Sequence, residues 1–242
     1  MSLFRYQWAG PLDILMVIPA GQHCLFRVLR TPLPQPTNQQ LTQLQRQQLQ
    51  QSSVLLSSGN DGLLRFWKLE SSKCDLIGVF RRHQSGINAL DVYAMQDRML
   101  LVVTGGDDNA LVLTNYLITE DNSVVVLEEQ ILNSAHSTQI TGAKFLSPRG
   151  NWLVSTGVDQ RLRLWQRVAG SLQEHCSRFS CIPDIAAFTC WRQELFFLLP
   201  DHFTLKNNED VVMVVGGEGL DVTLYVAKAE EAMISQTGYY LA

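Results

Sequence analysis

The chain has 242 residues, of which 46% are hydrophobic and 17% charged, and its net charge is −4. A chain of this length and composition can bury a substantial core, which excludes a wholly disordered protein. The negative charge argues against a strongly basic nucleic-acid-binding surface, although a local basic patch is compatible with it.

No apolar run approaches the roughly 18 to 20 residues needed to span a bilayer, and the N-terminus lacks a signal-peptide pattern. The five cysteines are an odd number scattered among predicted strands, which indicates a reducing, intracellular compartment. We therefore expect a cytoplasmic protein that does not cross a membrane.

Residues 1–30 predict two or three strands, interrupted at Gly10-Pro11 and Pro19-Ala20-Gly21. They belong either to a preceding structural unit or to the first unit described below. Residues 31–53 are rich in proline and then in glutamine, which predicts a solvated and partly helical insertion. This insertion is either an expanded surface loop or a partner-binding segment.

Residues 54–226 predict a repeated strand unit. The segment Gly59–Trp67 matches Gly157–Trp165 position for position, and looser copies are Gly106–Thr114 and Gly217–Tyr225. The glycines that open the four segments are 47, 51 and 60 residues apart. A unit of this length, built from short strands, is typical of a β-propeller. The tail, residues 227–242, is mildly helical in pattern as far as Gly238.

One unit carries His136, Ser155, Asp159 and Trp165, a spacing that resembles the WD40 family. Blades of that family link a His, a Ser or Thr, a turn Asp and a strand Trp by hydrogen bonds. The resemblance implies that His136 bridges Asp159 and Ser155, and that the Trp165 indole N–H completes the set. A buried network of this kind holds a blade in register only if every polar member is satisfied.

The other units keep only part of this set. The Gly106 unit has His83, Thr104 and Asp108, but Thr114 replaces the Trp. The Gly59 unit has Ser57 or Ser58, Asp61 and Trp67, and its only candidate histidine is the distant His23. In the fourth unit, the His, Asp and Trp positions hold Cys181, Gly219 and Tyr225.

The predicted fold is therefore all-β, with about four WD40-type blades. Members of this family usually have seven blades, and an open arc leaves sheet edges and apolar faces uncovered. We expect the chain to be the C-terminal part of a larger propeller protein, or a propeller that a partner completes.

The sequence predicts no catalytic, cofactor-binding or metal-binding set. His175, Cys176, Cys181 and Cys190 lack the paired spacing of a zinc site, and structural cysteines are the better interpretation. The run Gly216–Gly219 lacks the Lys-Ser/Thr and the following helix of a phosphate-binding loop. Asp107-Asp108-Asn109 lacks the rest of a calcium loop and predicts a β-turn.

Two groups of arginines form a candidate binding surface. Arg161 and Arg163 share the solvent-facing side of one strand and, with Lys144 and Arg149, could form a positive stripe. Arg81 and Arg82 form a second group. Such a stripe could contact RNA phosphates or an acidic protein, and ordinary solvated strand faces explain the same residues.

Across residues 54–226 the order of motifs resembles the C-terminal region of the WD-repeat protein 6 family. The motifs that carry this resemblance are Gly105–Asn109, Ala135–Ser137 with Gln139–Gly142, Gly157–Trp165 and Ile182–Asp184. Members of that family are non-catalytic partners of an FtsJ-type methyltransferase that methylates the 2′-oxygen of the tRNA wobble nucleotide.

The resemblance implies that this chain is an adaptor, not an enzyme. It would hold the methyltransferase and help to place the anticodon loop, with S-adenosylmethionine bound by the partner enzyme. The alternative is a general WD40 scaffold, such as a ubiquitin-ligase receptor or a trafficking subunit. The Trp-Asp-x-Arg motif that is usual in cullin-linked receptors is absent after both Trp67 and Trp165.

Overall fold

The computed structural model describes residues 53–180 except 71–72, 97 and 147–149, together with Ile182, Ile185, Phe188 and the backbone of seven further strands. Throughout these described residues the chain forms strands and turns, and it forms no helix. A helix able to cross a membrane is likewise absent from the described part of the chain.

Sixteen of the strands form four antiparallel four-stranded sheets, which we call blades 1 to 4. Blade 1 comprises β3 (Leu25–Pro32), β4 (Ser53–Gly59), β5 (Leu63–Leu69) and β6 (Cys74–Arg81). Blade 2 comprises β7 (Ile87–Ala94), β8 (Met99–Gly106), β9 (Leu111–Ile118) and β10 (Val124–Leu132).

The chain continues in the same order through the other two blades. Blade 3 comprises β11 (Ile140–Phe145), β12 (Trp152–Gly157), β13 (Arg161–Val168) and β14 (Ser171–Phe179). Blade 4 comprises β15 (Ala187–Arg192), β16 (Val211–Gly216), β17 (Leu220–Ala227) and β18 (Ala232–Gln236). A separate two-stranded sheet pairs β1 (Ser2–Arg5) with β2 (Asp13–Val17).

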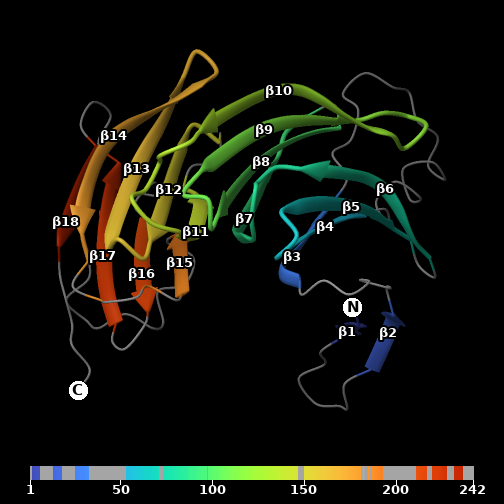
Figure 1. The fold of residues 1–242 in the computed structure, drawn as a ribbon, viewed down its shortest axis with the longest axis horizontal. Helices are drawn as coiled ribbons and strands as arrows, with labels where there is room; N and C mark the ends of the chain where they lie inside the picture. Colours follow the sequence, from blue (N-terminus) through green and yellow to red (C-terminus); the bar gives the residue numbers. More distant parts are fainter. Residues whose placement is uncertain are drawn as a thin grey trace.

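The blades follow one another around an arc that does not close into a ring (Figure 1). The first strands of neighbouring blades contact each other, so β3, β7, β11 and β15 line the inside of the arc. The last strands, β6, β10 and β14, form its outer rim. This arrangement confirms the predicted all-β fold of about four WD40-type blades in a partial propeller.

The structure resolves one alternative at the start of the chain and corrects one prediction at its end. Strand β3 pairs with β4, so it is the first strand of blade 1. The helical pattern of the tail is wrong over residues 232–236, where β18 pairs with β17 along its backbone. Pairing with a neighbouring strand therefore overrides a weak local preference. The Gln-rich segment of the predicted insertion lies outside the described residues.

Neighbouring blades pack face to face through apolar side chains. Blades 1 and 2 share a buried cluster that includes Leu56, Phe66, Val102 and Tyr116, with the Phe66 and Tyr116 rings 4.7 Å apart. Blades 2 and 3 share a second cluster that includes Leu113 and Trp165. Because blade 2 packs against a neighbour on both faces in this way, the arc is held by a repeated side-chain interface.

At the inner side of the second interface, backbone packs directly against a side chain. A Cβ atom at Gly105 would overlap the Cγ2 atom of Ile140 and lie 2.9 Å from its Cβ atom. Ile140 is fully buried, so it has no room to move away. Only glycine allows this approach of β8 to β11.

We therefore expect Gly105→Ala to lower the free energy of unfolding by about 1–3 kcal/mol, because the added methyl group overpacks the interface. Urea denaturation followed by tryptophan fluorescence would measure this loss. The double variant Gly105→Ala/Ile140→Ala should cost less than the sum of the two single changes. Additive costs would contradict the proposed overlap.

Candidate functional site

The tight turn between the second and third strands of a blade has the same geometry in blades 1, 2 and 3. The fourth turn residue has a positive φ in each case: 71° at Gly62, 63° at Asn109 and 60° at Gln160. Its N–H donates to the carbonyl oxygen of the opening glycine, three residues earlier, in all three turns. The left-handed residue lets the chain reverse sharply into a strand hairpin.

An aspartate at the third turn position stabilises each reversal. One carboxylate oxygen accepts the N–H two residues ahead, in Asp61 to Leu63, Asp108 to Ala110 and Asp159 to Arg161, at 3.1 to 3.2 Å. Aspartate side chains commonly make this local hydrogen bond in turns. In blades 2 and 3 the same carboxylate also accepts a main-chain N–H from the loop that precedes the blade.

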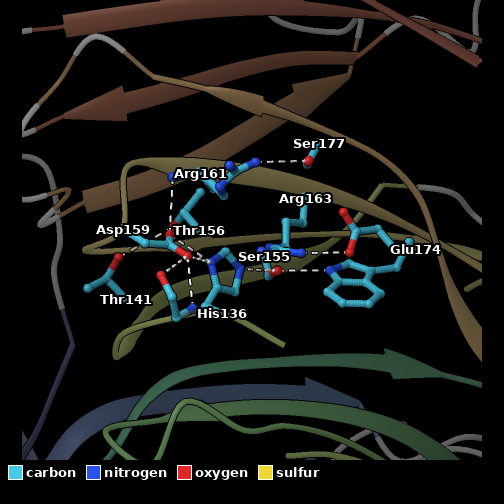
Figure 2. A network of polar contacts seen from close by, with 11 residues as sticks. His136, Thr141, Ser155, Thr156, Asp159, Arg161, Arg163, Glu174 and Ser177 are labelled. Atoms are coloured by element: carbon cyan, nitrogen blue, oxygen red, sulfur yellow. Dashed lines mark hydrogen bonds and ion pairs between the residues drawn. The ribbon is translucent and has the colours of Figure 1, made fainter. Parts of the chain in front are cut away.

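In blade 3 the four predicted residues form one continuous hydrogen-bond chain (Figure 2). The Trp165 Nε1–H group donates to Ser155 Oγ at 2.8 Å, and Ser155 Oγ lies 2.7 Å from His136 Nε2. His136 Nδ1 lies 2.9 Å from Asp159 Oδ1. Asp159 Oδ2 also accepts the Ser137 N–H at 3.1 Å. The chain thus ties β12, β13, the turn and the preceding loop together.

The direction of these bonds fits a neutral His136. If Nδ1 carries the proton, His136 donates to Asp159 and accepts the Ser155 hydroxyl at Nε2, so every member is satisfied. Burial lowers the pKa of His136, and this effect exceeds the opposing effect of Asp159. Burial opposes ionisation of Asp159, but hydrogen bonds from His136, Ser137 and Arg161 outweigh it and lower the pKa of that carboxyl.

Blade 2 has a shorter version of the same chain. His83 Nδ1 lies 2.8 Å from Asp108 Oδ1, and its Nε2 lies 2.9 Å from Thr104 Oγ1. Asp108 Oδ2 accepts the Gln84 N–H at 2.9 Å. Thr114 occupies the Trp position and is buried, so the chain ends at Thr104.

Blade 1 retains the other end of the chain. Trp67 Nε1 donates to Ser57 Oγ at 2.9 Å, which selects Ser57 over Ser58 as the member of this set. Asp61 forms an ion pair with Arg65 at 2.5 Å. His23, Cys181, Gly219 and the side chain of Tyr225 lie outside the described residues.

Ser155, His136 and Asp159 are ordered like a hydrolytic triad, but their surroundings do not suit catalysis. Ser155 is fully buried, and His136 is 2% exposed. Ser155 Oγ already accepts the Trp165 indole N–H. A nucleophile must reach a substrate carbonyl beside hydrogen-bond donors for the developing oxyanion, and a fully buried hydroxyl has no such access. The arrangement holds the blade together.

The expected positive stripe is largely neutralised. Arg163 pairs with Glu174 at 2.6 Å, and Lys144 pairs with Asp91 at 3.0 Å. The guanidinium of Arg161 lies 4.1 Å from the centre of the Phe179 ring and donates to Ser177 Oγ at 3.4 Å. Arg149 lies outside the described residues.

The second arginine group is also engaged. Arg82 pairs with Glu129 at 2.8 Å and donates to the Tyr116 hydroxyl at 2.5 Å, so it joins blade 1 to blade 2. Arg81 donates to the main-chain oxygen of Asp61 at 3.0 Å. Arg82 and Arg163 each have a carboxylate partner that would compete with a phosphate for the same charge, and their role in binding stays a prediction.

Contacts that the sequence does not predict also join the blades, at the inside of the arc and at its outer rim. The Phe145 N–H donates to Asp91 Oδ2 at 2.9 Å, beside the Lys144 ion pair. Gln130 Oε1 accepts the Leu172 N–H at 2.5 Å. No motif marks these residues, because each bond joins positions more than 40 residues apart that only the fold brings together.

The metal-like and turn-like motifs acquire no ligand-binding geometry within the described part of the chain. No group of three or more metal-binding side chains occurs among its residues. Asp107, Asp108 and Asn109 form the blade 2 turn. The thiols of Cys74 and Cys176 are free, and burial raises the pKa of each. The side chains of Cys181 and Cys190 and the run from 217 to 219 lie outside this part.

Comparison with known proteins identifies the repeat. The family model for the WD domain, G-beta repeat, matches residues 128–166. This span begins in β10 of blade 2 and ends in β13 of blade 3. One sequence repeat therefore joins the outer strand of one blade to three strands of the next.

Curated relatives resemble part of the chain. The tRNA (34-2'-O)-methyltransferase regulator WDR6 of Mus musculus is 27% identical over 169 residues, and that of Homo sapiens is 29% identical over 169 residues. Each match covers 57% of this chain and 15% of the relative. This chain thus corresponds to a small part of the length of the relatives it matches.

A solved structure resembles most of the chain in fold. The structure of U3-55K aligns with a TM-score of 0.55 over 89% of this chain and 52% of that chain. The two sequences are 14% identical over the alignment, so the likeness shows the fold alone.

We expect Trp165→Ala to lower the free energy of unfolding by about 3–5 kcal/mol, because a large buried side chain is lost. Asp159→Asn should lower it by about 1–3 kcal/mol, because the NH2 group of the new side chain cannot accept the hydrogen bonds that a carboxylate oxygen of Asp159 accepts. Urea denaturation would measure both losses. Asp107→Asn, at an exposed position of the equivalent turn, is the control and should change stability by less than about 0.5 kcal/mol. Equal effects at Asp107 and Asp159 would show that the chain of bonds is not needed.

Stability should also fall as the pH is lowered from about 7.5 to 5.5. The pKa of His136 in the folded protein lies below its ordinary value of 6.5, so the unfolded state binds the proton more readily. The stabilisation is complete above 6.5 and is lost as the pH falls toward the folded pKa. Thermal unfolding across this range would measure the change. His136→Asn should flatten the pH dependence, whereas His175→Ala, on the exposed face of β14, should retain it.

Three independent observations agree on the nature of the repeat. The sheets have four antiparallel strands, the turns share one geometry, and the bond chain of blade 3 coincides with the family match. Residues 128–166 therefore match a WD40 repeat within a partial propeller of WD40-type blades, and part of the chain has distant similarity to the tRNA (34-2'-O)-methyltransferase regulator WDR6.

Proposed function

We propose that this chain is a non-catalytic adaptor that supports an FtsJ-type methyltransferase in 2′-O-methylation of the tRNA wobble nucleotide. The observation that carries the proposal is the similarity to the mouse and human WDR6 regulators over 57% of the chain. In this role the partner enzyme binds S-adenosylmethionine and performs the reaction in the cytoplasm. The WD40 chain contributes a binding surface.

The site geometry supports such a division of work. The buried chain from Trp165 to Asp159 fixes the turns and the loops between blades. Rigid loops on a scaffold are the usual place for binding residues. The polar contacts at Arg82, Asp91 and Gln130 join neighbouring blades, so loops from different blades keep a constant separation.

Deleting the protein should lower 2′-O-methylation at tRNA position 34, which mass spectrometry of isolated tRNA would measure. The methyltransferase should co-purify with the full-length protein. Restoring the wild-type gene should restore methylation, and an Asp107→Asn gene should do so equally well. Unchanged methylation, with no methyltransferase recovered, would favour the general WD40 scaffold.

A further inference from the structure

The outer strand of blade 3 ends in an exposed aromatic side chain. Phe179 is 60% exposed, more than any other large apolar side chain on the surface of the described residues, and the others are aliphatic. It lies opposite Arg161 in the pairing of β14 with β13, at the end of the blade that carries the tight turn. Single exposed apolar side chains are common, so the neighbours of Phe179 decide what it can bind.

The neighbour of Phe179 is a guanidinium with unused hydrogen-bond donors. The Arg161 Cζ atom lies 4.1 Å from the centre of the ring, a cation–π contact that holds the two side chains together. A guanidinium has five N–H donors, and among the described residues this one bonds only to Ser177 Oγ, at 3.4 Å (Figure 2). None of its nitrogens is among the buried polar atoms that lack a partner in that part of the chain, so the unused donors are open to solvent.

The Arg161 charge also lacks a carboxylate partner. No acidic side chain of the described residues forms an ion pair with it, whereas Arg163, two residues farther along β13, pairs with Glu174 at 2.6 Å. Asp159, in the turn before Arg161, accepts hydrogen bonds from a histidine ring and from two main-chain N–H groups, one of them that of Arg161. Its charge partly offsets that of the guanidinium, so this corner of blade 3 suits contact with one phosphate and not with a duplex backbone.

The corresponding positions of blades 1 and 2 do not combine these features. In blade 2 the cross-strand pair is Leu111 and Leu132, and Leu111 is fully buried. In blade 1 the pair is Leu63 and Arg81, which places no ring beside the guanidinium. Arg82 makes the other cation–π contacts, but it pairs with a carboxylate and its rings are at least partly buried. An exposed ring with an unpaired cation over it is thus specific to blade 3 among the three blades whose side chains the structure describes.

We propose that Phe179 and Arg161 form a contact for single-stranded RNA, in which an unpaired base stacks on the exposed ring and the guanidinium donates to a neighbouring phosphate. Proteins commonly hold single strands by stacking bases on aromatic side chains, with arginine adding a cationic contribution. Bases inside a duplex are stacked on one another, so only unpaired nucleotides can use this contact. The inference rests on the proposed function, in which the unpaired nucleotides are those of the tRNA anticodon loop.

The chemistry of the pair favours a nucleotide over an acidic protein segment. A carboxylate would use the Arg161 guanidinium alone and would leave the Phe179 ring exposed. A nucleotide joins a planar aromatic base to an anionic phosphate, which matches a ring and a guanidinium on paired residues. The net charge of −4 argues against a broad basic surface, and a contact made largely by stacking does not require one.

The first test measures binding of the full-length protein to a short, unstructured, fluorescein-labelled RNA by fluorescence anisotropy. Phe179→Ala should weaken binding at least about five-fold through the loss of one stacked base, and Phe179→Trp should stay within about two-fold of the wild type. Leu76→Ala is the matched control, because Leu76 is 50% exposed on the outer strand of blade 1, and it should bind as the wild type does. With a duplex RNA of the same length, Phe179→Ala and the wild type should bind equally.

The second test measures the salt dependence of the same binding. Arg161→Gln should weaken binding, and the slope of log affinity against log salt concentration should fall by about 0.7, because one phosphate contact of a single strand is lost. Arg81→Gln removes an exposed arginine from the corresponding position of blade 1 and should leave both the affinity and the slope unchanged.

The outcomes separate this inference from the proposed function. No RNA binding by the wild type, or equal binding by the wild type and Phe179→Ala, would overturn the inference and leave the methylation experiment to decide the function. Weaker binding by Arg161→Gln alone would indicate an anion contact without stacking, and weaker binding of Phe179→Ala to the methyltransferase but not to RNA would assign the corner to a protein; either result would overturn the inference. Weaker RNA binding by Phe179→Ala together with unchanged tRNA methylation after deletion would support the contact and contradict the proposed function.

Discussion

The structure depends on one buried sequence of hydrogen bonds, from the Trp165 indole through Ser155 and His136 to Asp159. Each donor in it has one acceptor residue, so the position of each proton is fixed when His136 is neutral. The bonds connect two strands, a tight turn and the loop that enters the blade. A blade that slipped by one residue would break all of them at once, because strand side chains alternate between faces.

The blades show how far this network can be reduced. Blade 2 keeps the His83–Asp108 end and has Thr114 in place of the Trp, whereas blade 1 keeps the Trp67–Ser57 end. In both, the turn retains its left-handed fourth residue and its aspartate bond. The turn is thus the common element. The buried hydrogen bonds of the histidine and the tryptophan add stability in the blades that retain these residues.

The blades could be predicted from the repeated local spacing, and the network of blade 3 from the resemblance to the WD40 family. Gly157, Asp159 and Trp165 lie within nine residues, and strand alternation places them correctly. The binding role of the arginines stays a prediction, but their ion pairs could not be predicted from local spacing. The partners of Arg163 and Lys144, which are Glu174 and Asp91, come from other strands, and one of them comes from another blade. The strand β18 was missed because the local pattern of the tail is helical, whereas its pairing with β17 depends on the fold.

The close approach at Gly105 has a geometric consequence for the whole assembly. Near the inside of the arc, Gly105, Ala89 and Ala143 let the two sheets approach closely around the Ile140 side chain, and farther out Leu113, Trp165 and Leu172 fill the interface between blades 2 and 3. The two sheets are therefore closer together at the inside of the arc than at its outside, and they are inclined to each other as a wedge. The curvature of the arc, and with it the number of wedges that a full circle would require, is therefore encoded in the gradient of side-chain volume along the radius.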